Sequence, residues 1–177
     1  MKKNIILIPT KIEAQIVEKK EHIIISGIAK KTIKTLAKIH EATPISKAML
    51  IGFAGRLDDS LEINGTYNVT EVSNGVHHLV ISAINNKWEN VSIVTVKNPV
   101  HTVAKKTELA KLAQLVDMEC FYFTEYCLLN NITPYLVRII SDNCDAPLVD
   151  FFKANTFMET KTALQKAVKT IEQQLSL

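Results

Sequence analysis

Two acidic residues lie in a part of the sequence that is otherwise strongly apolar. Asp117 and Glu119 come at the start of a predicted helix, directly before Cys120–Phe123. Acidic side chains at a helix N-terminus commonly cap the helix or interact with its dipole, and that structural role needs no active site. A carboxylate buried among apolar residues, however, needs partners. This pair is therefore a candidate for a buried binding or catalytic site.

The second candidate segment is Leu136–Asp142, an apolar strand pattern that contains an arginine. Alternation along a strand points Arg138 and Asp142 to one face and Ser141 to the other, until the strand ends. A structural salt bridge would explain a lone arginine in a strand. The Ser141–Asp142 pair at the carboxyl end instead favours a site in which carboxyl groups transfer protons.

Two shorter segments are weaker candidates. Pro9–Ala14 passes from a strand into a helix and places Glu13 in the first helical turn, where glutamate is a favourable dipole partner. Ser26–Lys30 is a strand-to-helix turn, and its Gly27 permits close approach of the backbone to a ligand. Neither segment identifies a site by itself.

Strand and helix patterns alternate along the chain. Apolar residues repeat at helical spacing in Ile33–His40 and Leu164–Leu175, and a third helix is predicted over Met118–Leu129. Consecutive strand patterns surround the turn signal Asn74–Gly75. The predicted strands are Asn4–Ile8, His22–Ser26, Ala48–Phe53, Thr66–Val72, His78–Ser82, Val91–Val96 and Tyr135–Ser141.

This order of elements predicts an α/β fold, a three-layer sandwich in which helices flank a central mixed β-sheet. Ligands in such folds bind at the carboxyl ends of the strands. The segments that follow the predicted strands should therefore surround any site, and they are Thr10–Glu13, Gly27–Lys30, Ala54–Arg56, Lys97–Val100 and Ser141–Asp145.

The composition indicates an ordinary globular domain. Of the 177 residues, 47% are hydrophobic and 22% are charged, and no stretch rich in Pro, Gly or Ser marks a boundary, so residues 1–177 are expected to form a single domain. The 21 basic and 18 acidic residues are spread along the chain, which argues against a nucleic-acid partner. No apolar run is long enough for a membrane span.

Cysteine spacing gives no sign of a metal site. The three cysteines form no CxxC or Cys/His pattern, so we expect neither a zinc site nor a disulfide framework. A phosphate-binding loop of the Gly-x-x-x-x-Gly-Lys-Ser/Thr type is also missing from the sequence, and we expect no cofactor. Free cysteines fit a reducing compartment, which predicts a cytoplasmic protein.

Taken in order, five segments resemble the purine nucleoside phosphorylase and nucleosidase superfamily, in particular its methylthioadenosine/S-adenosylhomocysteine nucleosidase branch. The most specific are Val116–Glu119, similar to the family's Val-Glu-Met-Glu motif, and Val137–Asp142, similar to its Arg-Ala-Ile-Ser-Asp motif. The other three are Pro9–Ala14, Ser26–Lys30 and Phe53–Leu61. The resemblance implies hydrolysis of the N-ribosidic bond of a purine nucleoside, with release of the free base.

Breaking the bond between purine N9 and C1′ requires a proton donor. The base must leave as a neutral species, so an acid has to deliver a proton to N7 while a ribosyl cation develops. The resemblance assigns this role to Asp142 and has Ser141 orient it. Burial and a nearby carboxylate would raise the pKa of such an acid towards neutrality.

The resemblance also assigns the groups that would hold the sugar and the water. Glu119 would accept hydrogen bonds from the ribose 2′ and 3′ hydroxyls and stabilise the developing positive charge. Glu13, with Arg138 nearby, would position and activate the attacking water. The remaining residues that the resemblance places around the nucleoside are Met118, Asp117, Ala54, Gly55 and Phe152. Members of the family commonly form homodimers, so a homodimer is expected.

Two departures from the family pattern stand out. Ala29 replaces the second glycine of the turn, which should restrict backbone approach there. Arg56 stands where nucleosidases usually have a glycine, and it could alter access or provide an anion contact.

Three alternatives remain open at this point. A phosphorylase would use phosphate as the acceptor, and Arg56 with Lys11 or Lys30 could assemble a phosphate site. A futalosine-type hydrolase would share much of the same pattern. A shortened, non-catalytic nucleoside-binding protein would need Glu119 but not the combination of Asp142, Arg138 and Glu13.

Overall fold

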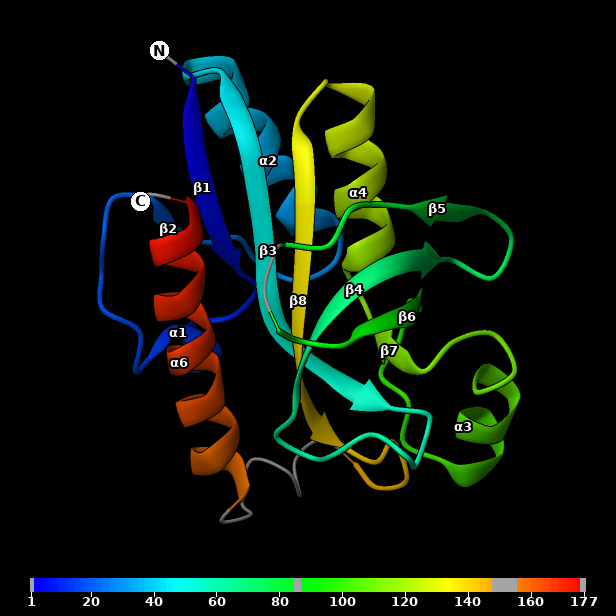
Figure 1. The fold of residues 1–177 in the computed structure, drawn as a ribbon. Coiled ribbons are helices and arrows are strands. Elements are labelled where there is room, and N and C mark those ends of the chain that lie inside the picture. The colour runs from blue at the N-terminus through cyan, green and yellow to red at the C-terminus, as the bar shows by residue number, and fades with distance from the viewer. Residues whose placement is uncertain (1, 85–86, 148–155, 176–177) are drawn as a thin grey trace.

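A computed structural model describes residues 2–84, 87–147 and 156–175 (Figure 1). The helices are α1 (Lys11–Ala14), α2 (Lys30–Ala42), α3 (Val103–Leu109), α4 (Cys120–Leu129) and α6 (Thr156–Leu175). The strands are β1 (Lys3–Ile8), β2 (Ile23–Ile25), β3 (Ile45–Arg56), β4 (Thr66–Ser73), β5 (His78–Val80), β6 (Asn90–Thr95), β7 (Leu115–Asp117) and β8 (Thr133–Asp142).

The strands form one mixed sheet in the order β2-β1-β3-β7-β6-β4-β5, and β8 pairs with both β3 and β4. Strand β1 is parallel to β2 and β3, and β3 is parallel to β8. Because β8 also pairs antiparallel with β4, and β7 pairs antiparallel with β3, the strands β3, β8, β4, β6 and β7 close into a ring. The predicted mixed α/β sandwich is confirmed, and its centre also closes on itself.

Both faces of the sheet are buried. In β1, Ile5 and Leu7 face a core shared with α2 and α4, whereas Ile6 and Ile8 face a core shared with α6. This explains why the strand is a continuous apolar run rather than an alternating one. Helices α2 and α4 cover one face and α6 covers the other, which gives the three layers seen in Figure 1. The apolar stripe predicted in the last helix packs there through Leu164, Ala167, Val168, Ile171 and Leu175.

The predicted hairpin around Asn74–Gly75 is also present. Strands β4 and β5 pair antiparallel, and the side-chain Oδ1 of Asn74 accepts hydrogen bonds from the backbone N–H groups of Val76 and His77. Gly75 has a φ of 86°, a conformation that glycine adopts without steric cost. The turn chemistry therefore sets the register of this hairpin.

Two short elements were not predicted, and one of them changes the position of a candidate residue. Helix α3 and strand β7 interrupt the region between β6 and α4. The prediction that Asp117 lies at the start of a helix is wrong, because Asp117 is the last residue of β7 and the helix begins at Cys120. With only three residues, β7 is too short for a recognisable period, and it is specified by its neighbours β3 and β6 instead.

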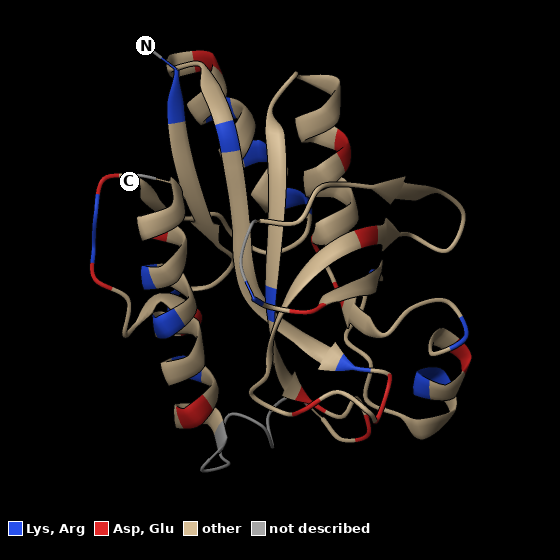
Figure 2. Cartoon of the chain, in the orientation of Figure 1, with Lys and Arg blue, Asp and Glu red and all other residues tan. Residues whose placement is uncertain are grey.

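Figure 2 shows charged residues of both signs spread over the elements of the described chain. Lys31, Lys34 and Lys38, spaced to share one side of α2, are all exposed. No helix among the described residues is long and apolar enough to span a membrane.

Candidate active site

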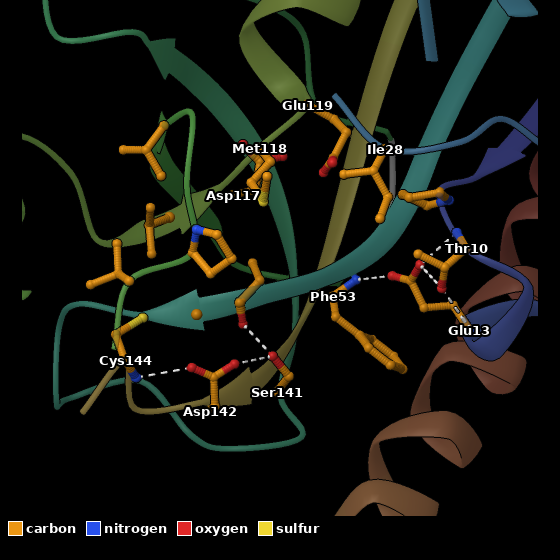
Figure 3. A pocket seen from close by; sticks show the side chains of 17 residues that line it. Thr10, Glu13, Ile28, Phe53, Asp117, Met118, Glu119, Ser141, Asp142 and Cys144 are labelled. Atoms are coloured by element: carbon orange, nitrogen blue, oxygen red, sulfur yellow. Dashed lines mark hydrogen bonds between the residues drawn. The ribbon is translucent and has the colours of Figure 1, made fainter. Parts of the chain in front are cut away.

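A pocket lies where β1, β2, β3, β6, β7 and β8 end (Figure 3). This is the edge of the sheet where ligands of α/β proteins are expected. Glu13 lies on one side of the pocket and Asp142 on another, and Glu119 enters from the position just before α4. The residues that line it are Pro9, Thr10, Glu13, Ile28, Phe53, Ala54, Gly55, Val96, Pro99, Val100, Val116, Asp117, Met118, Glu119, Ser141, Asp142 and Cys144.

Glu13 is buried, and both of its carboxylate oxygens accept backbone hydrogen bonds. Oε2 accepts from the N–H of Thr10 (2.8 Å) and from its hydroxyl (2.6 Å), and the Thr10 hydroxyl accepts from the Glu13 N–H, which completes a capping box at α1. Oε1 accepts from the N–H of Phe53 (2.8 Å). Burial raises the pKa of Glu13, although the hydrogen bonds and the charge of Arg138 oppose the increase. Glu13 therefore both caps helix α1 and lines the pocket.

Arg138 is fully buried beneath this pocket and does not line it. Its Nη2 donates to Asp117 Oδ2 (2.6 Å) and lies 3.8 Å from Glu119 Oε2. Asp117 also accepts from the Thr95 hydroxyl (2.7 Å) and the Cys120 N–H (2.9 Å), so its charge is satisfied on both oxygens. Within the described residues, the Nε and Nη1 atoms of Arg138 have no hydrogen-bond partner.

Glu119 is buried at the beginning of α4. Its Oε1 accepts a hydrogen bond from the N–H of Ala29 (3.0 Å). Burial, followed by the nearby charge of Asp117, raises the pKa of Glu119 to about 7, while Arg138 opposes the increase. Near neutral pH this carboxyl is therefore close to its titration midpoint.

The turn that supplies the Ala29 N–H has an unusual backbone. Ala29 adopts φ 52° and ψ −127°, a conformation that residues with a side chain rarely occupy. The sequence predicted that alanine here would restrict backbone approach. The backbone N–H nevertheless reaches Glu119, at the cost of this strained conformation.

Asp142 ends β8, and both of its oxygens are held. The Ser141 Oγ lies 2.5 Å from Asp142 Oδ2 and 3.2 Å from the Ala54 carbonyl oxygen, and the Cys144 N–H donates to Oδ1 (2.9 Å). The pairing of β3 with β8 shifts register here, so that Gly55 lies opposite Asp142. This shift places both Ser141 and Asp142 on the pocket wall, although strict alternation predicts opposite faces.

Most of the predicted site residues meet in this one pocket. Glu13, Ala54, Gly55, Asp117, Met118, Glu119, Ser141 and Asp142 line it, Arg138 lies behind it, and Phe152 falls outside the described residues. The sequence assigned no individual role to the other lining residues, which are Pro9, Thr10, Ile28, Phe53, Val96, Pro99, Val100, Val116 and Cys144. Several of them fall in the segments that follow predicted strands, and this position is the one sequence feature that could have placed them at the pocket.

The pocket wall is acidic. The described residues that line it include four carboxylic acids, Glu13, Asp117, Glu119 and Asp142, and no lysine or arginine. Arg56 does not line the pocket: its guanidinium donates to Asn143 and to the carbonyl of Leu61 instead. Among the described residues, no group of three or more His, Cys, Asp or Glu side chains is arranged to hold a metal ion.

Comparisons by sequence find no relative, since neither a protein-family model nor a curated protein matches the chain. Comparisons by structure do find similar proteins. The 5′-methylthioadenosine/S-adenosylhomocysteine nucleosidase of Helicobacter pylori, bound to butyl-thio-DADMe-Immucillin-A, is 18% identical with a TM-score of 0.84, over 98% of this chain and 99% of that one. The futalosine hydrolase of Helicobacter pylori is 17% identical with a TM-score of 0.82, over 98% of both chains.

A third similar structure is an MTAN variant from Chlamydia trachomatis bound to MTA, at 17% identity and a TM-score of 0.75, over 98% of both chains. The chain therefore has the α/β fold of the nucleoside phosphorylase and nucleosidase superfamily. More closely, its fold is that of methylthioadenosine/S-adenosylhomocysteine nucleosidases and futalosine hydrolase. The predicted resemblance is confirmed at the level of the fold.

Proposed function

We propose that the protein hydrolyses the N-ribosidic bond of a purine nucleoside of the methylthioadenosine or S-adenosylhomocysteine type and releases the free base. The observation that carries this proposal is the convergence of Asp142, Glu119 and Glu13 from three distant segments on one pocket. Each carboxyl matches one chemical requirement of the reaction. The similar structures that bind or cleave such nucleosides support the same conclusion.

Asp142 acts as the proton donor. The C1′–N9 bond breaks with its electron pair moving into the base, and Asp142 delivers a proton to N7 so that the base leaves neutral. The hydrogen bonds from Ser141 and from the Cys144 N–H keep the carboxyl in one orientation. A fixed donor avoids the entropic cost of finding the productive geometry during the reaction.

Glu119 binds the ribose. An ionised carboxylate accepts hydrogen bonds from the 2′ and 3′ hydroxyls, and its negative charge stabilises the ribosyl cation as it forms. With a pKa of about 7, Glu119 is held in a site where ionisation is unfavourable without a partner. The hydroxyls and the developing cation supply that partner in the reaction.

Glu13, with Arg138 nearby, activates the attacking water. Glu13 accepts a proton from the water as its oxygen bonds to C1′, which yields the free sugar hydroxyl. Because burial raises the pKa of Glu13, this base is stronger than an exposed glutamate. Arg138 lies close enough to affect that pKa and is anchored by Asp117. Proton exchange with solvent afterwards removes the proton from Glu13 and returns one to Asp142.

Water is favoured over phosphate as the acceptor. Phosphate sites are generally built from arginine or lysine side chains, whereas the part of the pocket wall that the structure describes carries four acids and no basic residue. Arg56, the arginine that a phosphate site would need, donates to the neutral oxygens of Asn143 and Leu61. A futalosine-type substrate is the second candidate, because a futalosine hydrolase has a similar fold.

The proposal is tested by incubating the protein with methylthioadenosine, S-adenosylhomocysteine, adenosine, inosine and aminofutalosine, each with and without phosphate. We expect free base and free sugar from a 5′-thio nucleoside at the same rate in both conditions. Formation of a sugar 1-phosphate that depends on phosphate would show a phosphorylase instead. Binding without cleavage of any of the five would show a nucleoside-binding protein, and cleavage of aminofutalosine alone would identify the second candidate.

A further inference from the structure

Arg56 forms a three-point connection at the end of β3. Its Nε and Nη2 both donate to Asn143 Oδ1, at 2.9 and 2.5 Å, and its Nη1 donates to the Leu61 carbonyl (2.6 Å). An additional ion pair with Asp59 is longer, at 3.8 Å. The side chain is only 18% exposed. Arg56 therefore joins the loop after β3 to the turn after β8.

The acceptor, Asn143, directly follows Asp142 in the chain. The pairing of β3 with β8 ends at Gly55 and Asp142. The backbone that follows Asp142 is therefore not held by pairing with β3. Cys144 then adopts a left-handed φ of 58° and turns its N–H back to Asp142 Oδ1. Such a conformation is unfavourable for a residue with a side chain and persists only where neighbouring contacts impose it.

Two contacts impose that turn. The first is the close approach of Cys144 to Gly55. A Cβ at position 55 would clash with the sulfur of Cys144, so the turn can lie against β3 only because residue 55 is glycine. Arg56 is the second, since it fixes the side chain of Asn143 between Asp142 and Cys144. An asparagine held by two donors cannot rotate away without breaking both hydrogen bonds.

We propose that Arg56 is a positioning residue for Asp142, acting through Asn143 to keep the turn in the form that aims the carboxyl into the pocket. The inference rests on the proposed function for the role of Asp142. The side chain of Arg56 does not line the pocket, so substrate binding should depend on it little, whereas proton delivery should depend on it strongly.

The test compares Arg56→Ala, Arg56→Lys and Asn143→Ala with the wild-type protein. We expect both alanine variants to lower kcat by about 10- to 100-fold while KM stays within a few fold, because misplacing a catalytic group by about 1 Å has effects of this size. Arg56→Lys, which retains one donor to Asn143, should recover part of the rate. The double alanine variant should be no slower than either single variant, since both remove the same connection.

Lys106→Ala is the matched control. Its Nζ pairs with Asp59 (2.6 Å) on the same loop, but it does not contact Asn143, so its kcat should equal that of the wild type. Asn143→Ala keeps the hydrogen bond from Arg56 to Leu61 and should stay folded even where Arg56→Ala does not. A drop in thermal stability with unchanged kcat in both alanine variants would overturn the proposal.

Amide hydrogen exchange gives a readout that does not need activity. The Cys144 N–H should exchange at least about tenfold faster in Arg56→Ala, while the Ile140 N–H, bonded to the Gly65 carbonyl, stays protected. Unchanged Cys144 exchange would overturn the inference. If the wild-type protein cleaves no nucleoside, the proposed function fails, and exchange at Cys144 still decides whether Arg56 holds the turn.

Discussion

Replacing Glu119 with glutamine removes a buried carboxyl whose ionisation the fold disfavours. The pKa of Glu119 is about 7 in the folded protein, against an ordinary value of 4.5, chiefly because the side chain is buried. One pKa unit corresponds to about 1.4 kcal/mol, so ionising this group inside the protein costs about 3 kcal/mol. Glutamine keeps an oxygen for the Ala29 N–H and has no charge to ionise.

The direction of the pH effect follows from the order of the two pKa values. Below pH 4.5 the carboxyl is neutral in both the folded and the unfolded chain, and its favourable contribution to folding is fully present. As pH rises from 4.5 through about 7, the unfolded chain loses the proton first, and this contribution is lost. We therefore expect the free energy of unfolding of Glu119→Gln, relative to that of the wild type, to increase by about 3 kcal/mol between pH 4 and pH 8.

Urea denaturation at several pH values between 4 and 8 measures this difference directly. Glu125→Gln, an exposed position on the same helix, is the control, and its difference from wild type should stay within about 0.5 kcal/mol across the range. If the difference in free energy of unfolding between Glu119→Gln and the wild type does not change with pH, the pKa of Glu119 is not raised in the folded protein. Wild-type kcat/KM should also rise with pH through about 7, because only ionised Glu119 accepts both ribose hydroxyls.

Three further substitutions test the surroundings of the site. Gly52→Ala would place a Cβ 2.8 Å from Glu13 Oε1 and 3.1 Å from Arg138 Nη1. Because this displaces Glu13, steady-state kinetics should show a loss in kcat/KM of at least about tenfold. Kinetics equal to those of the wild type would contradict this packing. Ala29→Gly should relieve the positive φ and raise the free energy of unfolding by about 1 kcal/mol in urea melts, whereas a decrease would show that the turn is not strained. Asp117→Asn should leave Arg138 without its main counter-charge and reduce stability by about 3–5 kcal/mol, which an unchanged thermal midpoint would exclude.

Much of the site could be predicted from where its residues stand relative to the strands, because the ends of apolar strands can be recognised in the sequence. Glu13 lies in the first helical turn after one strong apolar run, Asp142 ends another, and the carboxyl ends of those two strands meet at one edge of the sheet. The partner of Glu13 could not be predicted in the same way. The Phe53 N–H that holds Oε1 is 40 positions away, and only the parallel pairing of β1 with β3 brings the two together.

Other details depend on backbone geometry that residue types do not reveal. The position of Asp117 was predicted wrongly because a three-residue strand has no readable period of its own. The sequence suggested that Arg56 could alter access or contact an anion, and it did not reveal the hydrogen bond to Asn143, 87 positions later in the chain. That contact exists because β3 and β8 end side by side, which is a property of the sheet rather than of either segment.

The most direct test of the central claim is a comparison of turnover and binding in Asp142→Asn. Asparagine keeps the shape of the side chain and an oxygen for the Cys144 N–H, but it cannot deliver a proton to the base. Cleavage of methylthioadenosine is followed by release of free base, and binding of the intact nucleoside is measured by calorimetry. Loss of most turnover with binding within a few fold of wild type is the predicted result. Turnover equal to that of the wild type would contradict the assignment of Asp142 as the acid that breaks the bond.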